Sequence, residues 1–225
     1  MKLTYYGHAC FAVETAGRSL LFDPFIGGNP LAAKIDPQSI KADWILVSHG
    51  HQDHLADAVA IANRTDATII AAYEVAVWLG KQGARKTHPI NHGSTRFGFG
   101  RLRFVNALHS SSLPDGSYGG NPGGFVVEAP EGNFYYSGDT ALTRDMELVG
   151  QSGPLKFAAL CLGGNYTMDV ADALQAAKWI GCDQIVGVHY DTFSPIAIDH
   201  AEAEKKFKAA GKQLHLLKVG ESRDF

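Results

Sequence analysis

Short apolar runs of strand length recur along the chain, and the segments that join them change character in a repeated order. The first three runs are separated by glycine turn signals, which predicts an antiparallel meander. Strand-like runs then alternate with helical patterns, and the same succession returns in the second half. The predicted strands are Leu3–Tyr6, Cys10–Glu14, Ser19–Phe22, Trp44–Val47, Thr68–Ala71, Leu102–Ala107, Phe125–Glu128, Phe134–Tyr136, Phe157–Leu162, Gln184–Val188 and Leu214–Val219.

Helical patterns cover Leu55–Ala62 and Glu74–Leu79, and two more helices are signalled later. Asp169 is a candidate N-cap for a helix that Gly181 ends, and a helix over His200–Ala210 is also followed by a glycine. Two mixed sheets packed on each other, with helices outside both, would accommodate this order and bury the apolar face of each helix. We therefore predict an α/β fold in a single domain spanning residues 1–225.

The composition narrows the classes of partner. The formal net charge of −3 shows no basic excess, so we expect no nucleic-acid partner. No apolar run is long enough for a spanning helix, and the N-terminus MKLTYYGHACF lacks the apolar core of a signal peptide. We expect a cytoplasmic protein without membrane attachment. The three cysteines form no CxxC pair, which favours small buried thiols over a disulfide framework or a thiolate zinc site.

Polar side chains with metal-binding chemistry follow several of the apolar runs. The segment SHGHQDHL, residues 48–55, comes directly after WILV, and further candidates follow RFVNAL, FYYSG and QIVGV. Because strand ends on one edge of a sheet converge in space, these groups are expected to meet at the rim of the domain. The predicted metal ligands are His49, His51, Asp53, His54, His109, Asp139 and His189. This set is large enough for two ions.

The spacing of the ligands suggests how they are shared. In an extended segment alternate side chains point the same way, so His49 and His51 can approach one ion. The loop turning into a helix would carry Asp53 and His54 toward a second, and the two oxygens of Asp139 could bridge both. Imidazole and carboxylate suit Zn²⁺ and also admit Mn²⁺, Fe or Ni. Such sites hold ions ~3.5–4 Å apart with a shared water as hydroxide.

The pattern of these residues resembles that of a known superfamily. SHGHQDH, followed by His109, Asp139 and His189, is similar to the metallo-β-lactamase superfamily over nearly the whole chain. More closely, the phrases YYGHACFAVE, LLFDPFIGGNP, GGNYTMDVADA and HYDTFSPI resemble its uncharacterised bacterial and archaeal metal-dependent hydrolase family, whose relatives include L-ascorbate-6-phosphate lactonase.

The resemblance implies a four-layer αββα sandwich with the site at the edge between the two sheets. It also implies a distribution of ligands between two ions. One ion would be held by His49, His51 and His109, the other by Asp53, His54 and His189, with Asp139 bridging them.

A few further positions have a possible role. The resemblance implies that Asp23 anchors the ligand loop by hydrogen bonds, although a turn-forming Asp before proline is the alternative. His8 lies at a glycine turn, where it could contact substrate or donate a proton, or be structural. We take Asp53 and His8 as the candidate catalytic residues. The glycine-rich segment Leu113–Gly124 could overhang the site or be a plain surface loop, and Thr192 and Ser194 could line the pocket.

These observations predict a metal-dependent hydrolase of a small molecule, in which a hydroxide bridging two ions attacks a lactone, phosphoester or phosphodiester. β-Lactam hydrolysis is not expected, because similarity of fold does not carry substrate. The alternatives are a di-iron redox protein and a non-catalytic metal-binding protein on the same fold. Association into a homo-oligomer stays open.

Overall fold

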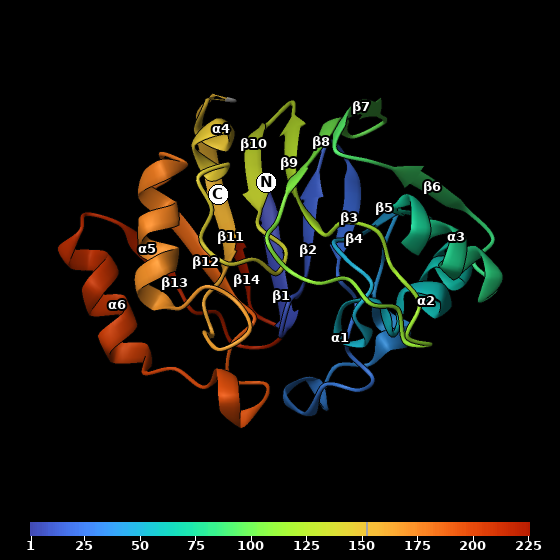
Figure 1. Ribbon diagram of the computed structural model, residues 1–225, viewed down its shortest axis with the longest axis horizontal. Coiled ribbons are helices and arrows are strands. Elements are labelled where there is room, and N and C mark those ends of the chain that lie inside the picture. Colours follow the sequence, from blue (N-terminus) through green and yellow to red (C-terminus); the bar gives the residue numbers. More distant parts are fainter. Residues whose placement is uncertain (152) are drawn as a thin grey trace.

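Two seven-stranded sheets face each other in the computed structural model, which describes residues 1–151 and 153–225 (Figure 1). The spatial order in the first sheet is β14 (Ser222–Asp224), β1 (Lys2–Gly7), β2 (Cys10–Thr15), β3 (Arg18–Phe22), β4 (Trp44–Val47), β5 (Thr68–Ala72) and β6 (Thr87–Ile90). In the second sheet it is β7 (Gly93–Phe97), β8 (Gly100–Asn106), β9 (Gly123–Ala129), β10 (Gly132–Tyr136), β11 (Leu155–Cys161), β12 (Gln184–Val188) and β13 (Gln213–His215).

The two sheets repeat one pairing pattern. Neighbours from β14 to β3 pair antiparallel and neighbours from β3 to β6 pair parallel. In the second sheet the pairing is antiparallel from β7 to β10 and parallel from β10 to β13. The parallel halves need crossover connections, which is why helices appear there. The repeated order expected from the sequence is therefore confirmed.

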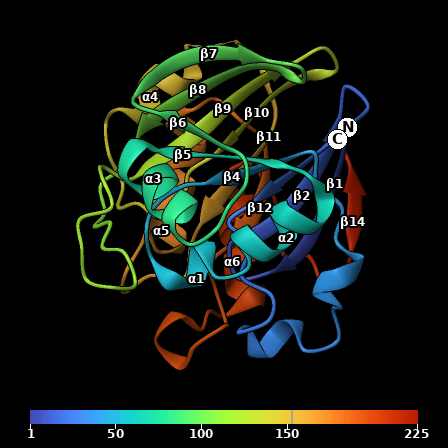
Figure 2. The same ribbon diagram turned by 90° about the vertical axis from the view of Figure 1, so that its right-hand side faces the viewer.

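Helices cover the outer face of each sheet. On the first lie α1 (Gln52–Leu55), α2 (Ala58–Thr65) and α3 (Tyr73–Lys81), and Figure 2 looks onto α2 and α3. On the second lie α4 (Met146–Gly150), α5 (Val170–Trp179) and α6 (His200–Ala209). Short 3-10 turns occupy Pro30–Ala32, Pro37–Ser39 and Ser194–Ile196. The predicted four-layer αββα sandwich is confirmed.

None of the helices in the described part of the chain is both long and apolar enough to cross a bilayer.

The caps of the late helices agree with the sequence signals. The carboxylate of Asp169 accepts hydrogen bonds from the amides of Ala171 and Asp172 at 2.8 and 2.9 Å, which satisfies two of the free donors at the start of α5. Asp199 does the same for Glu202 at the start of α6. Gly181 follows α5 with a φ of 66°, a conformation that glycine adopts without a steric penalty.

Aromatic side chains fill the space between the sheets. Phe11 stacks on Phe22 with ring centroids 4.6 Å apart, and Tyr136 from the opposite sheet meets Phe11 edge to face at 5.0 Å. All three rings are fully buried, and pairs of this geometry add to the free energy gained by burial alone. The three cysteines are buried and free, as expected.

The structure differs from the sequence-based expectation in several elements. The single helix predicted over Leu55–Ala62 is wrong, because α1 ends at Leu55 and α2 begins at Ala58. Between them Asp57 accepts hydrogen bonds from the amides of Ile26 and Gly27, and so fastens this break to the loop after β3. The last predicted strand is wrong beyond His215, because the chain leaves the sheet there to return to β1 and β14.

Candidate metal centre

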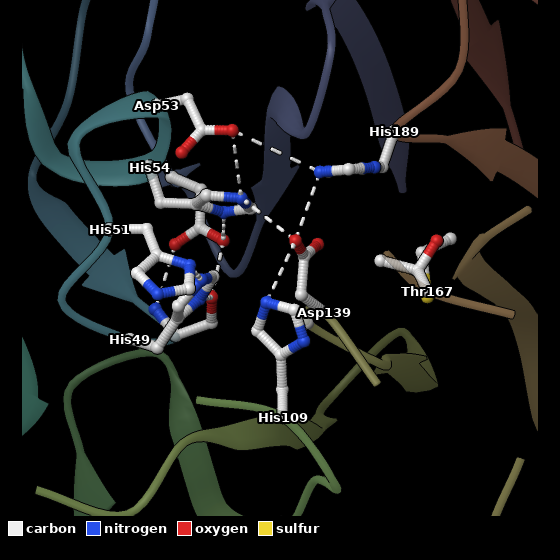
Figure 3. A network of polar contacts seen from close by, with 12 residues as sticks. His49, His51, Asp53, His54, His109, Asp139, Thr167 and His189 are labelled. Carbon is white, nitrogen blue, oxygen red and sulfur yellow. Dashed lines mark hydrogen bonds and ion pairs between the residues drawn. The ribbon is translucent and has the colours of Figure 1, made fainter. Parts of the chain in front are cut away.

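All of the predicted ligands lie together at one edge of the sandwich, where β4, β8, β10 and β12 end (Figure 3). The loop after β4 leads directly into α1, and candidate ligands come from both the loop and the helix. The first group consists of His49, His51 and His109, whose ligand atoms lie within 4.8 Å of one another. Their ring centroids are separated by 4.5 to 5.1 Å. Burial lowers the pKa of each of these histidines, which favours the neutral form that binds metal.

The second group consists of Asp53, His54 and His189, joined by His8, again with ligand atoms within 4.8 Å of one another. Asp139 lies between the two groups. Its Oδ2 atom is 2.9 Å from Nε2 of His189, 3.3 Å from Nε2 of His54 and 3.7 Å from Nε2 of His109. One carboxylate oxygen therefore lies within 3.7 Å of a histidine nitrogen from each of the two groups.

Neighbouring histidines stabilise the negative charge of Asp139. Burial by itself would raise the pKa of this carboxyl, but His189 and His54 outweigh that effect and hold it well below its ordinary value. Burial likewise lowers the pKa of His54, yet Asp139 and Asp23 outweigh it and hold the pKa well above the ordinary value. The surroundings of Asp139 and His54 therefore favour an ionised Asp139 carboxylate.

Buried polar atoms at the centre lack partners within the described chain. Nε2 of His54 and Oδ1 of Asp139 are shielded from solvent and accept or donate no hydrogen bond. Leaving such an atom unsatisfied typically costs ~1–3 kcal/mol. Nε2 of His49 also faces Nδ1 of His51 at 2.9 Å, so two ring nitrogens compete for one proton. A cation that accepts several lone pairs satisfies all of these atoms at once, so the residues fit a metal centre.

Asp23 holds the ligand loop from below. Its fully buried carboxylate accepts hydrogen bonds from the amide of Ser48 at 2.7 Å, the hydroxyl of Ser48 at 2.6 Å, the hydroxyl of Tyr136 at 2.6 Å and Nδ1 of His54 at 2.7 Å. In the neutral ring that binds metal, the proton donated to Asp23 lies on Nδ1, so Nε2 has the lone pair that faces the centre. The geometry is that of the anchoring role implied by the resemblance.

Ser48 fixes the tautomer of the next residue. Its hydroxyl proton is given to Asp23, so toward Nδ1 of His49, at 2.9 Å, the oxygen can only accept. His49 then carries its proton on Nδ1 and turns the lone pair of Nε2 toward the centre. One serine thus relays the orientation set by Asp23 to a second candidate ligand.

His8 lies beneath the second group rather than in the pocket. Its side chain is fully buried, Nε2 lies 2.9 Å from Oδ2 of Asp53, and Nδ1 lies 2.9 Å from the hydroxyl of Thr192. Both ring nitrogens are therefore engaged. Burial lowers the pKa of His8 to about 4, with the Asp53 hydrogen bond opposing the shift. This arrangement suits orientation of Asp53 better than delivery of a proton to substrate.

Several of these residues occupy the left-handed region of backbone conformation. His8, Asp23 and His189 have φ values of 55°, 40° and 56°. Such conformations cost about 1–3 kcal/mol for residues other than glycine and persist where the surrounding contacts fix them. Here the amide of His189 donates to the carbonyl of His8 at 2.8 Å, which joins the ends of β12 and β1 under the centre.

A pocket of about 210 Å³ opens over the ligands. Besides ligands it is lined by Ser110, Tyr166 and Phe193. A neighbouring hollow shares His109 and Ser110 and is also lined by Ser111, Ser112 and residues of the glycine-rich loop between 116 and 122. That loop therefore lies beside the site. Of the other residues expected to line the pocket, Thr192 lies under it against His8, and Ser194 is not among its lining residues.

The pocket walls were not anticipated from the sequence. Tyr166 and Phe193 each lie in an irregular segment without strand or helix periodicity, so nothing in the local pattern marks them. Ser48 and Tyr136 were also missed as supports of the ligands. The only available signal was their position, because each stands at the end of a strand whose loop carries a ligand.

Comparison with known proteins identifies the family. Residues 2–189 match the model of the beta-lactamase superfamily domain. A UPF0173 metal-dependent hydrolase from Flavobacterium johnsoniae is 52% identical over 223 residues, which cover 99% of both chains. The chain belongs to this UPF0173 metal-dependent hydrolase family. A relative from Methylacidiphilum infernorum is also 52% identical over 99% of both chains. The predicted superfamily, family and enzyme class are thereby confirmed.

Solved structures of similar proteins support the same fold. Igni18, described as a novel metallo hydrolase from Ignicoccus hospitalis, superimposes on this UPF0173 hydrolase with a TM-score of 0.88 at 32% identity, covering 100% and 98% of the two chains. An isothiocyanate hydrolase from Delia radicum gut bacteria gives a TM-score of 0.82 at 21% identity, covering 100% and 99% of the chains, and shows the shared fold alone.

Proposed function

We propose that this hydrolase cleaves an ester-like bond of a small molecule, a lactone, phosphoester or phosphodiester, at a centre of two divalent metal ions. The position of Asp139 carries the proposal, because its Oδ2 atom lies 2.9 Å from His189 and 3.7 Å from His109, members of the two separate groups of ligands. His49, His51 and His109 would hold one ion, Asp53, His54 and His189 the other, and Asp139 would contact both. Zinc suits these ligands best, and Mn, Fe or Ni could replace it.

When bound, such ions lower the pKa of a water molecule so that hydroxide is available at neutral pH, and they offset charge that develops on the attacked group. The protein's contribution is orientation and charge. Asp23 and Ser48 turn the lone pairs of His54 and His49 inward, so these ligands need little rearrangement. Buried Asp139 brings negative charge without an accompanying cationic side chain in the pocket lining described here.

Asp53 is the candidate for proton handling. Its side chain is 31% exposed, it lines the pocket, and its pKa is held below the ordinary value by His8 and His54 despite partial burial, so it is ionised at neutral pH. We propose that its carboxylate takes a proton from the attacking water and returns it to the leaving group. His8, at 2.9 Å, would hold the carboxylate in the position for this transfer.

Metal analysis with turnover tests the proposal. Protein purified without added metal is analysed for its elements and assayed with bis(p-nitrophenyl) phosphate and a small lactone, before and after chelation and reloading. We expect about two divalent ions per chain and hydrolysis that is lost on chelation and restored by metal. Iron with a redox-active spectrum would favour the di-iron redox alternative. Bound metal without hydrolysis of either compound would favour a non-catalytic metal protein.

A further inference from the structure

The mouth of the pocket carries exposed aromatic side chains. Tyr166 is 58% exposed and Phe193 is 40% exposed, and both line the pocket together with metal ligands. Tyr118, which is 66% exposed, lines the neighbouring hollow beside His109. Large apolar rings exposed at a concave site are typical of binding surfaces for apolar groups. Phe193 is also held in place, since its ring packs edge to face on buried His8 at 5.6 Å.

Basic side chains are missing from the same region. No Lys or Arg lines the pocket or the neighbouring hollow among the residues that the structure describes. The sequence shows why, because the segments that build the site contain neither residue. These segments are 42–63, 104–143, 157–177 and 179–204, in a chain with 20 Lys and Arg in all. A phosphate or carboxylate outside the reacting bond would therefore find no cationic partner.

The helix N-terminus that follows Tyr166 in the sequence is already filled. The N-terminus of α5, close in sequence to Tyr166, already binds the carboxylate of its own cap Asp169. Asp191, two residues before Phe193 in the sequence, is acidic and pairs with His200 at 2.6 Å. The rim thus favours an uncharged group over an anionic one.

We propose that the substrate is uncharged outside the reacting bond and carries an apolar group that packs against Tyr166 and Phe193. These two residues are then specificity-determining. This inference rests on the proposed hydrolase function and narrows it, because phosphorylated lactones and other substrates with a remote anionic group are poor ligands. Charge at the reacting group itself is not restricted, since it meets the metal centre.

A matched pair of probes tests the inference. We compare γ-phenyl-γ-butyrolactone with the same lactone carrying a phosphonate in the para position of the ring. With metal-loaded protein we expect kcat/KM to be at least about tenfold higher for the uncharged probe. Phe193→Ala and Tyr166→Ala should each raise KM for the phenyl lactone by about fivefold to tenfold with little change in kcat. For unsubstituted γ-butyrolactone, which has no phenyl ring to pack against these side chains, the rise in KM should be smaller. Leu148→Ala, at an exposed apolar residue of α4, is the control.

A binding measurement separates this inference from the hydrolase proposal. Saturation-transfer NMR with metal-free protein reports contact with each probe without turnover. Signal from the phenyl lactone that is lost in both variants supports the inference even if no lactone is hydrolysed, an outcome that would count against the hydrolase proposal alone. Equal binding or turnover of the phosphonate probe, or variants that bind and turn over the phenyl lactone like the wild type, would overturn the inference.

Discussion

Asp23 and Asp139 approach opposite nitrogens of one imidazole, that of His54. Oδ2 of Asp23 lies 2.7 Å from Nδ1, and Oδ2 of Asp139 lies 3.3 Å from Nε2. The two aspartates follow β3 and β10, which hold the same place in the repeated pairing pattern of the two sheets. Their surroundings differ, because Asp23 accepts hydrogen bonds on both oxygens whereas Oδ1 of Asp139 has no partner within the described chain. The same residue type therefore supports the ligands in one sheet and is itself a candidate ligand in the other.

Replacing Asp139 by Ala should remove bound metal and activity together, because the side chain approaches both groups of ligands. We expect metal content to fall from about two ions per chain to fewer than one, and kcat/KM to fall by at least about a thousandfold. Elemental analysis and lactone turnover measure the two effects. Asp66→Asn, at an exposed aspartate of the α2–β5 turn, should change neither. Retention of the full metal content would contradict the bridging assignment.

Replacing Asp23 by Ala should weaken metal binding without abolishing it. Loss of the carboxylate frees the ring of His54 to rotate, and supports of this kind are typically worth about 10–100-fold in metal affinity. It also leaves the hydroxyl of Tyr136 and the amide of Ser48 without an acceptor, so we expect unfolding free energy to fall by about 3 kcal/mol. Competition with a chelator and urea denaturation give the two values. Tyr136→Phe, which removes one donor only, should cost about 1 kcal/mol and leave metal affinity within about threefold.

Replacing His8 by Ala should leave the metal content intact and lower kcat by about 10–100-fold, because Asp53 loses the hydrogen bond that orients it. Thr192→Val removes the partner on the far side of the same ring and should produce a smaller loss of the same kind. Steady-state kinetics on metal-loaded protein are the measurement. Unchanged kcat in His8→Ala would return this histidine to a purely structural role, whereas loss of metal would make it a ligand.

The stability of the protein should fall in mild acid partly because of His215, which is not one of the candidate metal ligands. This ring is 8% exposed, and burial, aided by Arg223, lowers its pKa from 6.5 to about 4. The unfolded chain then binds a proton before the folded chain does, so the stabilisation present above pH 6.5 is lost as the pH falls toward 4. Between pH 7 and 4.5 the free energy of unfolding should fall by about 1 kcal/mol less in His215→Gln than in the wild type. Urea denaturation of both proteins at these two pH values provides the comparison, and identical losses would refute the assignment.

Much of the fold, and the meeting of the candidate ligands at one edge, could be predicted because both depend on local sequence. Strands such as β4, WILV, and β12, QIVGV, are apolar along most of their length, and the histidines that follow within two residues, His49 and His189, are conspicuous. β6 and β7 were missed because both are largely exposed edge strands without an apolar alternation. Their pairing with β5 and β8 is decided by tertiary structure, which a local pattern does not carry.

The walls and supports of the site could not be predicted for a different reason. That Phe193 faces the centre depends on the path of an irregular segment, and that His8 meets Asp53 depends on contact across 45 positions of sequence. Side-chain direction in such cases follows from packing and from conformations such as the positive φ of His8, which no residue type guarantees. The ends of strands indicate where functional side chains meet, but not the direction in which the neighbouring side chains point.

The pairing of β1 with β14 has a consequence for how the chain folds. Lys2 lies opposite Asp224 and Thr4 opposite Ser222, so one edge of the first sheet is made from segments at opposite ends of the sequence. Contacts between such distant segments slow folding, because the entropy of closing a long loop is lost before the contact forms. During synthesis the backbone groups on this edge of β1 therefore stay unpaired, and accessible to other strands, until residues 222–224 emerge. Newly made chains should depend on protection from aggregation until these residues have emerged.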